Sequence, residues 1–178
     1  MGGALPLTTD DVFLNDVQST GAVSRTVVVN ANQTWQSLTI NQFTEPFSGF
    51  TTNRLSVLGG CALTLTNATM LSTQGAPQAP VVIDLASGST LGFGYNSTAS
   101  ATLGSNTIVT GSGEIKNSNG DISLTLNVDG TLAGPTLNLS NANRKNTLVL
   151  GPGTVVTNAQ TWTMDHGGYI TSPALDNR

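Results

Sequence analysis

Residues 129–139 read Asp-Gly-Thr-Leu-Ala-Gly-Pro-Thr-Leu-Asn-Leu, and they contain the unit that decides the fold. In this unit a turn residue is followed by Thr and then by an apolar residue. It occurs at residues 130–132 and 135–137 here, and elsewhere at residues 89–91, 106–108, 146–148 and 153–155. Polar and apolar residues that alternate between Gly, Asn or Pro are typical of very short β-strands joined by tight turns.

Similar segments extend this pattern along the whole chain, whereas no 12-residue window carries an uninterrupted helical stripe. Successive strands begin about 7 to 11 residues apart, so two or three sides would give a coil of about 20 to 30 residues. Strands are expected at residues 11–15, 25–30, 36–41, 54–58, 62–66, 81–85, 90–93, 106–110, 122–126, 136–139, 146–150, 154–157 and 160–163.

We predict an all-β protein, a right-handed parallel β-solenoid that forms a single domain over residues 1–178. A β-sandwich or jelly roll is the alternative. The solenoid is favoured because the strands are very short and because no Asn-Gly or Asp-Gly hairpin sits symmetrically between two long strands. Thr and Asn at matching positions can also stack as ladders between coils. Two segments, at about residues 41–53 and 73–80, interrupt the regular spacing of the strands and are expected to project as loops.

The composition excludes several classes of function. Only 9% of the 178 residues are charged, and the net charge is −4. Arg144 and Lys145 are the only adjacent cations, so no nucleic-acid interface is expected. No stretch approaches 18 apolar residues, so no membrane insertion is expected. Residues 1–11 carry no cation and no long apolar run, so no signal peptide is predicted.

Three segments near the N-terminus resemble the first coils of repetitive β-helical proteins. They are Pro6-Leu-Thr-Thr-Asp-Asp-Val-Phe-Leu-Asn15, Thr26-Val-Val-Val-Asn30 and Trp35-Gln-Ser-Leu-Thr-Ile40. The pattern is similar to that of phage virion proteins and autotransporter-like adhesins. Later Gly-Ser-Thr-Leu and Asp-Gly-Thr-Leu units are similar to the pectin-lyase-like solenoid class. The resemblance implies a right-handed parallel β-helix on a virion or on a bacterial surface.

Few residues could carry chemistry, and we predict no catalytic, cofactor-binding or metal-binding residue. His166 is the only histidine, next to Asp165, and one histidine does not make a typical zinc site. Cys61 is the only cysteine, so no intrachain disulfide forms. The companion motifs of the β-helical polysaccharide hydrolases and the Gly-Gly-x-Gly-x-Asp calcium repeat are both absent from the sequence.

Two Thr-x-Thr pairs, Thr64-Leu-Thr66 and Thr161-Trp-Thr163, suggest the flat threonine arrays of ice-binding solenoids. Such an array needs the same register in every coil. Two widely separated pairs do not supply it, so an ice-binding face is not predicted.

The sequence therefore indicates a non-enzymatic structural protein of a phage virion, either a capsid decoration protein or a segment of a tail or head fibre. Its expected partners are copies of itself, with a trimer favoured, and other virion proteins. Phe43, Phe47 and Phe50 are the candidate interface residues, since they crowd one loop with Pro46. A bacterial surface adhesin or autotransporter passenger fragment is the first alternative, and a polysaccharide-active β-helix enzyme is the second.

Overall fold

Nineteen short β-strands account for the regular structure of the residues that the computed structural model describes, which are 6–15, 25–41, 52–77, 79–141, 143–157, 161–164 and 168–172. The strands are β1 (Asp11–Asn15), β2 (Arg25–Val29), β3 (Gln33–Trp35), β4 (Ser37–Asn41), β5 (Asn53–Val57), β6 (Ala62–Leu65), β7 (Thr69–Gln74), β8 (Val81–Leu85), β9 (Thr90–Phe93), β10 (Thr98–Leu103), β11 (Thr107–Gly111), β12 (Glu114–Asn117), β13 (Ser123–Val128), β14 (Thr131–Ala133), β15 (Thr136–Asn138), β16 (Thr147–Leu150), β17 (Val155–Thr157), β18 (Trp162–Thr163) and β19 (Tyr169–Thr171).

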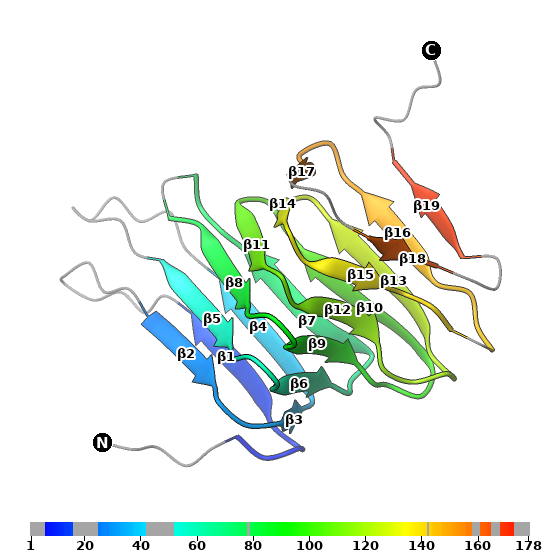
Figure 1. Ribbon diagram of the computed structural model, residues 1–178, viewed down its shortest axis with the longest axis horizontal. Helices are drawn as coiled ribbons and strands as arrows, with labels where there is room; N and C mark the ends of the chain where they lie inside the picture. Colours follow the sequence, from blue (N-terminus) through cyan, green and yellow to red (C-terminus); the bar gives the residue numbers. More distant parts are fainter. Residues whose placement is uncertain are drawn as a thin grey trace.

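Every third strand joins the same sheet, so the chain winds around three faces (Figure 1). Sheet A has the order β1-β4-β7-β10-β13-β16-β19, sheet B the order β17-β14-β11-β8-β5-β2, and sheet C the order β18-β15-β12-β9-β6-β3. Neighbouring strands pair in parallel in all three sheets. The prediction of a parallel β-solenoid is confirmed, and the β-sandwich alternative, which needs antiparallel sheets, is excluded.

The coils change in length along the chain. In sheet A, Asp11 is in register with Ser37, Leu38 with Leu71, and Thr147 with Tyr169. The stretch of chain between paired residues is therefore longest in the second coil and shortest in the last two. The corner between sheets B and C also varies in length, since residues 58–61 separate β5 from β6 but only residues 134–135 separate β14 from β15.

The core is built from inward-facing apolar residues that stack on one another from coil to coil. Burial alternates along the strands, as in β13, where Leu124, Leu126 and Val128 are buried and the residues between them are half-exposed. The stack of sheet C contains Leu63, Leu91, Ile115 and Leu137, and that of sheet B contains Leu55, Ile83, Val109 and Leu132. Each fully buried aliphatic side chain contributes about 1.5 to 3 kcal/mol, so these inward-facing stacks are the main source of the stability of the fold.

Asparagine side chains bond between coils at the corner that leads from sheet C to sheet A. Asn146 is fully buried, and its Oδ1 accepts hydrogen bonds from the Leu124 amide at 2.9 Å and from Asn117 Nδ2 at 3.3 Å. Asn141 Nδ2 donates to the Ile122 carbonyl at 2.6 Å. Amide side chains can satisfy buried backbone groups without a charge, and they do so here at a corner rather than in the stacked ladders that the sequence predicted.

The two predicted loops are described to different extents. Thr73 and Gln74 belong to β7, so the second connection covers residues 75–80 rather than 73–80. It is packed onto the solenoid, because Ala76 and Ala79 are buried and exchange two backbone hydrogen bonds of 3.0–3.1 Å. Residues 42–51, which make up most of the first loop, lie outside the described residues.

Candidate assembly surfaces

Within the described residues, each carboxylate has a partner in the fold. Some accept backbone or side-chain hydrogen bonds in turns and between coils, and others form surface ion pairs. The contacts are Asp10 with the Leu7 amide (2.8 Å), Asp11 with Ser37 Oγ (2.5 Å), Asp84 with Arg54 (3.7 Å), Glu114 with Lys116 (3.9 Å) and with Asn138 (3.0 Å), Asp121 with Asn143 (3.3 Å) and Asp129 with the Gly153 amide (2.7 Å). These carboxylates connect coils and turns.

Several residues singled out in the sequence cannot be placed. Phe43, Phe47, Phe50, Asp165 and His166 all lie outside the described residues, so their roles remain predictions. The described part of the chain contains no group of three or more His, Cys, Asp or Glu side chains able to hold a metal ion. In the same residues there is no helix with the length and apolar character needed to cross a membrane.

Cys61 lies at the corner between sheets B and C. Its side chain is half-buried, and its Sγ lies 4.0 Å from the Gly59 carbonyl oxygen. The corner therefore holds this thiol as a small packing residue.

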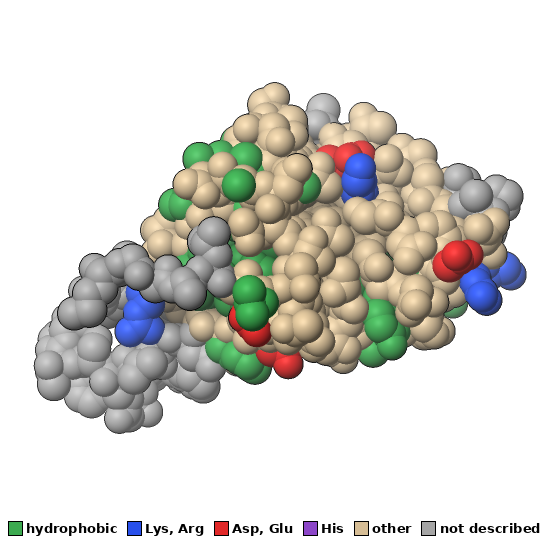
Figure 2. All heavy atoms as spheres, turned by 90° about the horizontal axis from the view of Figure 1, so that it is seen from below, with side chains coloured by type: hydrophobic (Ala, Val, Ile, Leu, Met, Phe, Trp, Pro, Cys, Tyr) green, Lys and Arg blue, Asp and Glu red, His purple; other side chains and the backbone are tan. Residues whose placement is uncertain are grey.

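The outward face of sheet A is polar but almost free of charge. Between β4 and β16, its outward positions carry hydroxyl or amide side chains, with one valine. These residues are Ser37, Thr39, Asn41, Thr69, Ser72, Gln74, Thr98, Ser100, Thr102, Ser123, Thr125, Asn127, Thr147 and Val149. Figure 2, which views the molecule from one side, shows charged side chains as a few separate groups on a surface that is mostly neither charged nor hydrophobic.

The ladders that contain the Thr-x-Thr pairs do not run as threonine along the sheet. Thr64 is in register with Thr34 in the preceding strand but with Gly92 in the following one, and Gly92 is in register with Lys116. Thr163 is in register with Asn138. Sheet C therefore presents no threonine array on the residues described, in agreement with the sequence argument.

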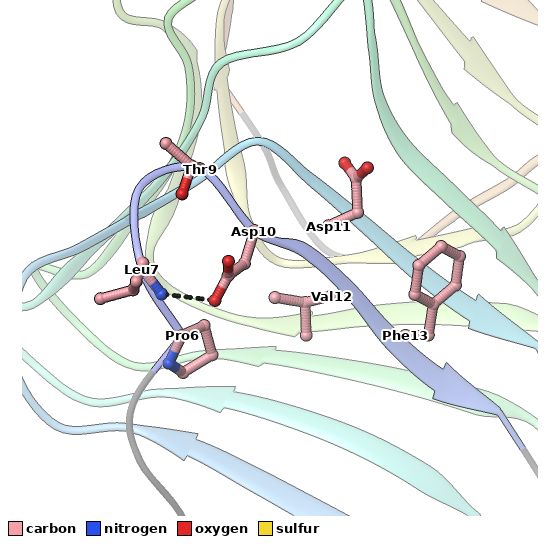
Figure 3. A pocket seen from close by; sticks show the side chains of 7 residues that line it. All are labelled: Pro6, Leu7, Thr9, Asp10, Asp11, Val12 and Phe13. Carbon is pink, nitrogen blue, oxygen red and sulfur yellow. Dashed lines mark hydrogen bonds between the residues drawn. The ribbon is translucent and has the colours of Figure 1, made fainter.

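The N-terminal end of the solenoid has an open, shallow depression lined by residues 6, 7 and 9–13 (Figure 3). A tight turn forms its rim, because the Leu7 amide donates to Asp10 Oδ2 and the Asp10 amide donates to the Leu7 carbonyl. In β1, Asp11 and Phe13 are exposed while Val12 between them is half-buried. The depression thus combines two carboxylates with two exposed apolar side chains, Leu7 and Phe13, which are 67% and 61% exposed.

The C-terminal end exposes residues that belong to the core by register. Val156 continues the stack of Leu132, and Ile170 continues that of Leu148, yet they are 45% and 44% exposed. Tyr169, beside Ile170, is 53% exposed. The inner positions of the last coil are therefore left partly open to solvent, at the opposite end of the stack from β1 (Figure 1).

The corner that leads into sheet A carries charges of opposite sign at its two ends. Asp10 and Asp11 lie at the start of β1, at the N-terminal end. Arg144 and Lys145 lie between β15 and β16, near the C-terminal end, and are both exposed. Asp121 lies at the same corner one coil earlier, before β13, and bonds to Asn143 beside Arg144, so charges of both signs occur along this corner.

Sequence reasoning did not assign residues to these end surfaces, although it noted that Arg144 and Lys145 are adjacent. Alternation in residues 11–15 does indicate that Asp11 and Phe13 share a face. Their position at an open end depends on the register of the coils, which the sequence alone does not give. Comparisons with protein-family models, with curated proteins and with solved structures found no match, so the geometry of these surfaces is the basis for a function.

Proposed function

We propose that this chain is a non-enzymatic structural protein of an assembled particle, namely a phage virion, where it serves as a decoration protein or a fibre segment. It acts as a homo-oligomer and joins other virion proteins. The observation that supports this proposal best is the exposure of inward-register residues such as Val156 and Ile170 at the end of the solenoid.

Exposed core positions favour a partner for a physical reason. Apolar surface that is removed from water contributes about 25 cal/mol per Å², and unpaired strand edges are templates for further pairing. A short solenoid therefore gains stability when its terminal coils are covered. The involvement of the described carboxylates in turns, corners and ion pairs favours a structural role over glycoside hydrolysis, which needs two carboxyl groups on either side of the scissile bond.

The bacterial surface adhesin is the second candidate. The uncharged hydroxyl face of sheet A favours it, because such a face can make many neutral hydrogen bonds to an extracellular partner. This candidate requires no association between copies of the chain, which distinguishes it from the virion proposal.

Sedimentation velocity of the purified chain over a range of protein concentrations tests the proposal. We expect a sedimentation coefficient that rises with concentration toward that of an oligomer, and the mass of the species also tests the predicted trimer. A protein that stays monomeric at the highest concentration would contradict the assembly role and leave the adhesin as the better candidate.

A further inference from the structure

The turn that leads from β12 to β13 contains the only Asn-Gly pair in the sequence, Asn119-Gly120. A hydrogen bond of 3.3 Å from the Ile122 amide to the Asn119 carbonyl oxygen closes the turn. Asn119 is half-exposed, and Gly120 and Asp121 are exposed. Solvent therefore reaches this turn, which lies at the corner between sheets C and A.

The side chain of Asn119 is held more firmly at its oxygen than at its nitrogen. Its Oδ1 accepts a hydrogen bond from the Asp121 amide at 3.0 Å, which forms an Asx turn. Its Nδ2 donates only across 3.5 Å, to the Gly94 carbonyl oxygen in the preceding coil. The ring closed by the Asx hydrogen bond contains the backbone nitrogen of Gly120, so the carboxamide is folded toward that nitrogen. The bond to the Asp121 amide also polarises the carboxamide and makes its carbon, Cγ, more electrophilic.

The same local arrangement occurs at two other asparagines, without the glycine. Asn117 and Asn138 are half-buried, and each Oδ1 accepts a hydrogen bond from the amide two residues further on, at 3.0 and 3.3 Å. They are followed by Ser118 and Leu139. Glycine lacks Cβ and reaches backbone conformations that other residues rarely adopt. Of these three asparagines, Asn119 is therefore the one whose carboxamide the next backbone nitrogen reaches with least hindrance.

We propose that Asn119 is a deamidation site, at which the folded protein converts slowly to aspartate and isoaspartate. Hydroxide takes the proton of the Gly120 amide, and the nitrogen then attacks Cγ of Asn119. The new N–Cγ bond forms, the Cγ–Nδ2 bond breaks, and Nδ2 leaves as ammonia after taking a proton from water, which regenerates the hydroxide. Water opens the resulting cyclic imide at one of its two carbonyl groups, giving aspartate or isoaspartate. The inference is independent of the proposed function.

The conversion changes the corner as well as the charge. An amide donor that faces the Gly94 carbonyl oxygen becomes a carboxylate, so a hydrogen bond is replaced by repulsion between two oxygen atoms. The new negative charge also lies close to Asp121, whose amide bonds to this side chain. Isoaspartate in addition lengthens the main chain of the turn by one methylene group. Each product therefore weakens the link between neighbouring coils at this corner.

Peptide mapping by mass spectrometry tests the site in the folded protein. The purified chain is incubated in mildly alkaline buffer, circular dichroism confirms that it stays folded, and the fraction converted at each asparagine is followed with time. We expect Asn119 to convert at least about tenfold faster than Asn117 and Asn138, because only Asn119 precedes a glycine. The rate should rise with pH, since the attacking nitrogen must first lose its proton. Equal rates at the three asparagines would overturn the inference.

Gly120→Ala is the matched variant. Gly120 is not among the glycines with positive φ, and an added Cβ would meet only Asn143 Nδ2 among the described residues, at an ordinary contact distance of 3.6 Å. The variant should therefore keep the β spectrum of the wild type, while conversion of Asn119 falls to the rate of Asn117 and Asn138. A folded Gly120→Ala variant that converts as fast as the wild type also overturns the inference. Either result leaves the sedimentation test of the proposed function unaffected.

Discussion

Asn146 joins three segments at the corner between sheets C and A, and its replacement by alanine measures how much the corner contributes to stability. The side chain is fully buried. Its Nδ2 donates to the Leu139 carbonyl at 2.5 Å, while its Oδ1 accepts from the Leu124 amide at 2.9 Å and from Asn117 Nδ2 at 3.3 Å. Asn146→Ala removes these three hydrogen bonds together and leaves the backbone partners in a buried corner.

The magnitude follows from the groups that lose their partner. A buried backbone donor or acceptor left unsatisfied costs about 1 to 3 kcal/mol, and here the Leu124 amide and the Leu139 carbonyl are both affected. The removed amide group also leaves a small void. We therefore expect Asn146→Ala to lower the free energy of unfolding by about 2 to 5 kcal/mol.

Urea unfolding followed by far-ultraviolet circular dichroism measures this loss. The matched control is Asn143→Ala at the same corner, where the exposed side chain bonds to Asp121 at 3.3 Å. Substitutions of this kind usually change stability by less than about 0.5 kcal/mol. If the two variants unfold at the same urea concentration, and the free energy of unfolding depends on urea with the same slope, the buried amide of Asn146 does not stabilise the corner and the reasoning is refuted.

Two further predictions concern the corner between sheets B and C and the buried hydroxyl groups. Gly111 has φ +98° and an added Cβ would meet the Leu85 carbonyl oxygen, whereas Gly60 has φ +76° and open space around it. Urea unfolding should show a cost of about 1 to 2 kcal/mol for Gly60→Ala and clearly more for Gly111→Ala; equal costs would contradict the close approach of the coils. Ser89 is buried and its Oγ has no hydrogen-bond partner among the described residues, while the hydroxyls of Thr107 and Thr73 lie 2.9 Å apart. Ser89→Ala should therefore leave thermal stability unchanged or raise it, and Thr107→Val should lower it by about 1 kcal/mol; a clear loss with Ser89→Ala would show that its hydroxyl has a bonding role.

Most of the strands that sequence reasoning identified hold large aliphatic residues at their inward positions, although Thr69–Gln74 was missed despite its buried Met70 and Leu71. Val81–Leu85 and Thr90–Phe93 were predicted with the bounds that the structure has. The missed strand Thr98–Leu103 places alanines at two inward positions, so its alternation of hydrophobicity is weak. Glu114–Asn117 was missed because it carries two charged residues around a single inward Ile115. Such strands form because parallel neighbours supply the pairing, which local propensity does not record.

The candidate surfaces were less predictable than the fold. The charge pairs at residues 10–11 and 144–145 are visible in the sequence as isolated dipeptides. Their placement on the same corner follows from Asp10 preceding β1 and Lys145 preceding β16, both strands of sheet A. Assigning both pairs to strands of the same sheet requires knowing the number of strands in each coil. The strands that sequence reasoning missed in the middle of the chain are enough to make that assignment wrong.

The low charge of the chain follows from the solenoid itself. In a parallel ladder each outward side chain lies about 4.8 Å from its counterparts in the neighbouring coils, so a repeated charge would repel itself along the whole face. Hydroxyl and amide side chains avoid this repulsion. Where charges do occur on the sheet faces, they are balanced locally, as in the ion pair of Arg54 with Asp84 from the adjacent strand.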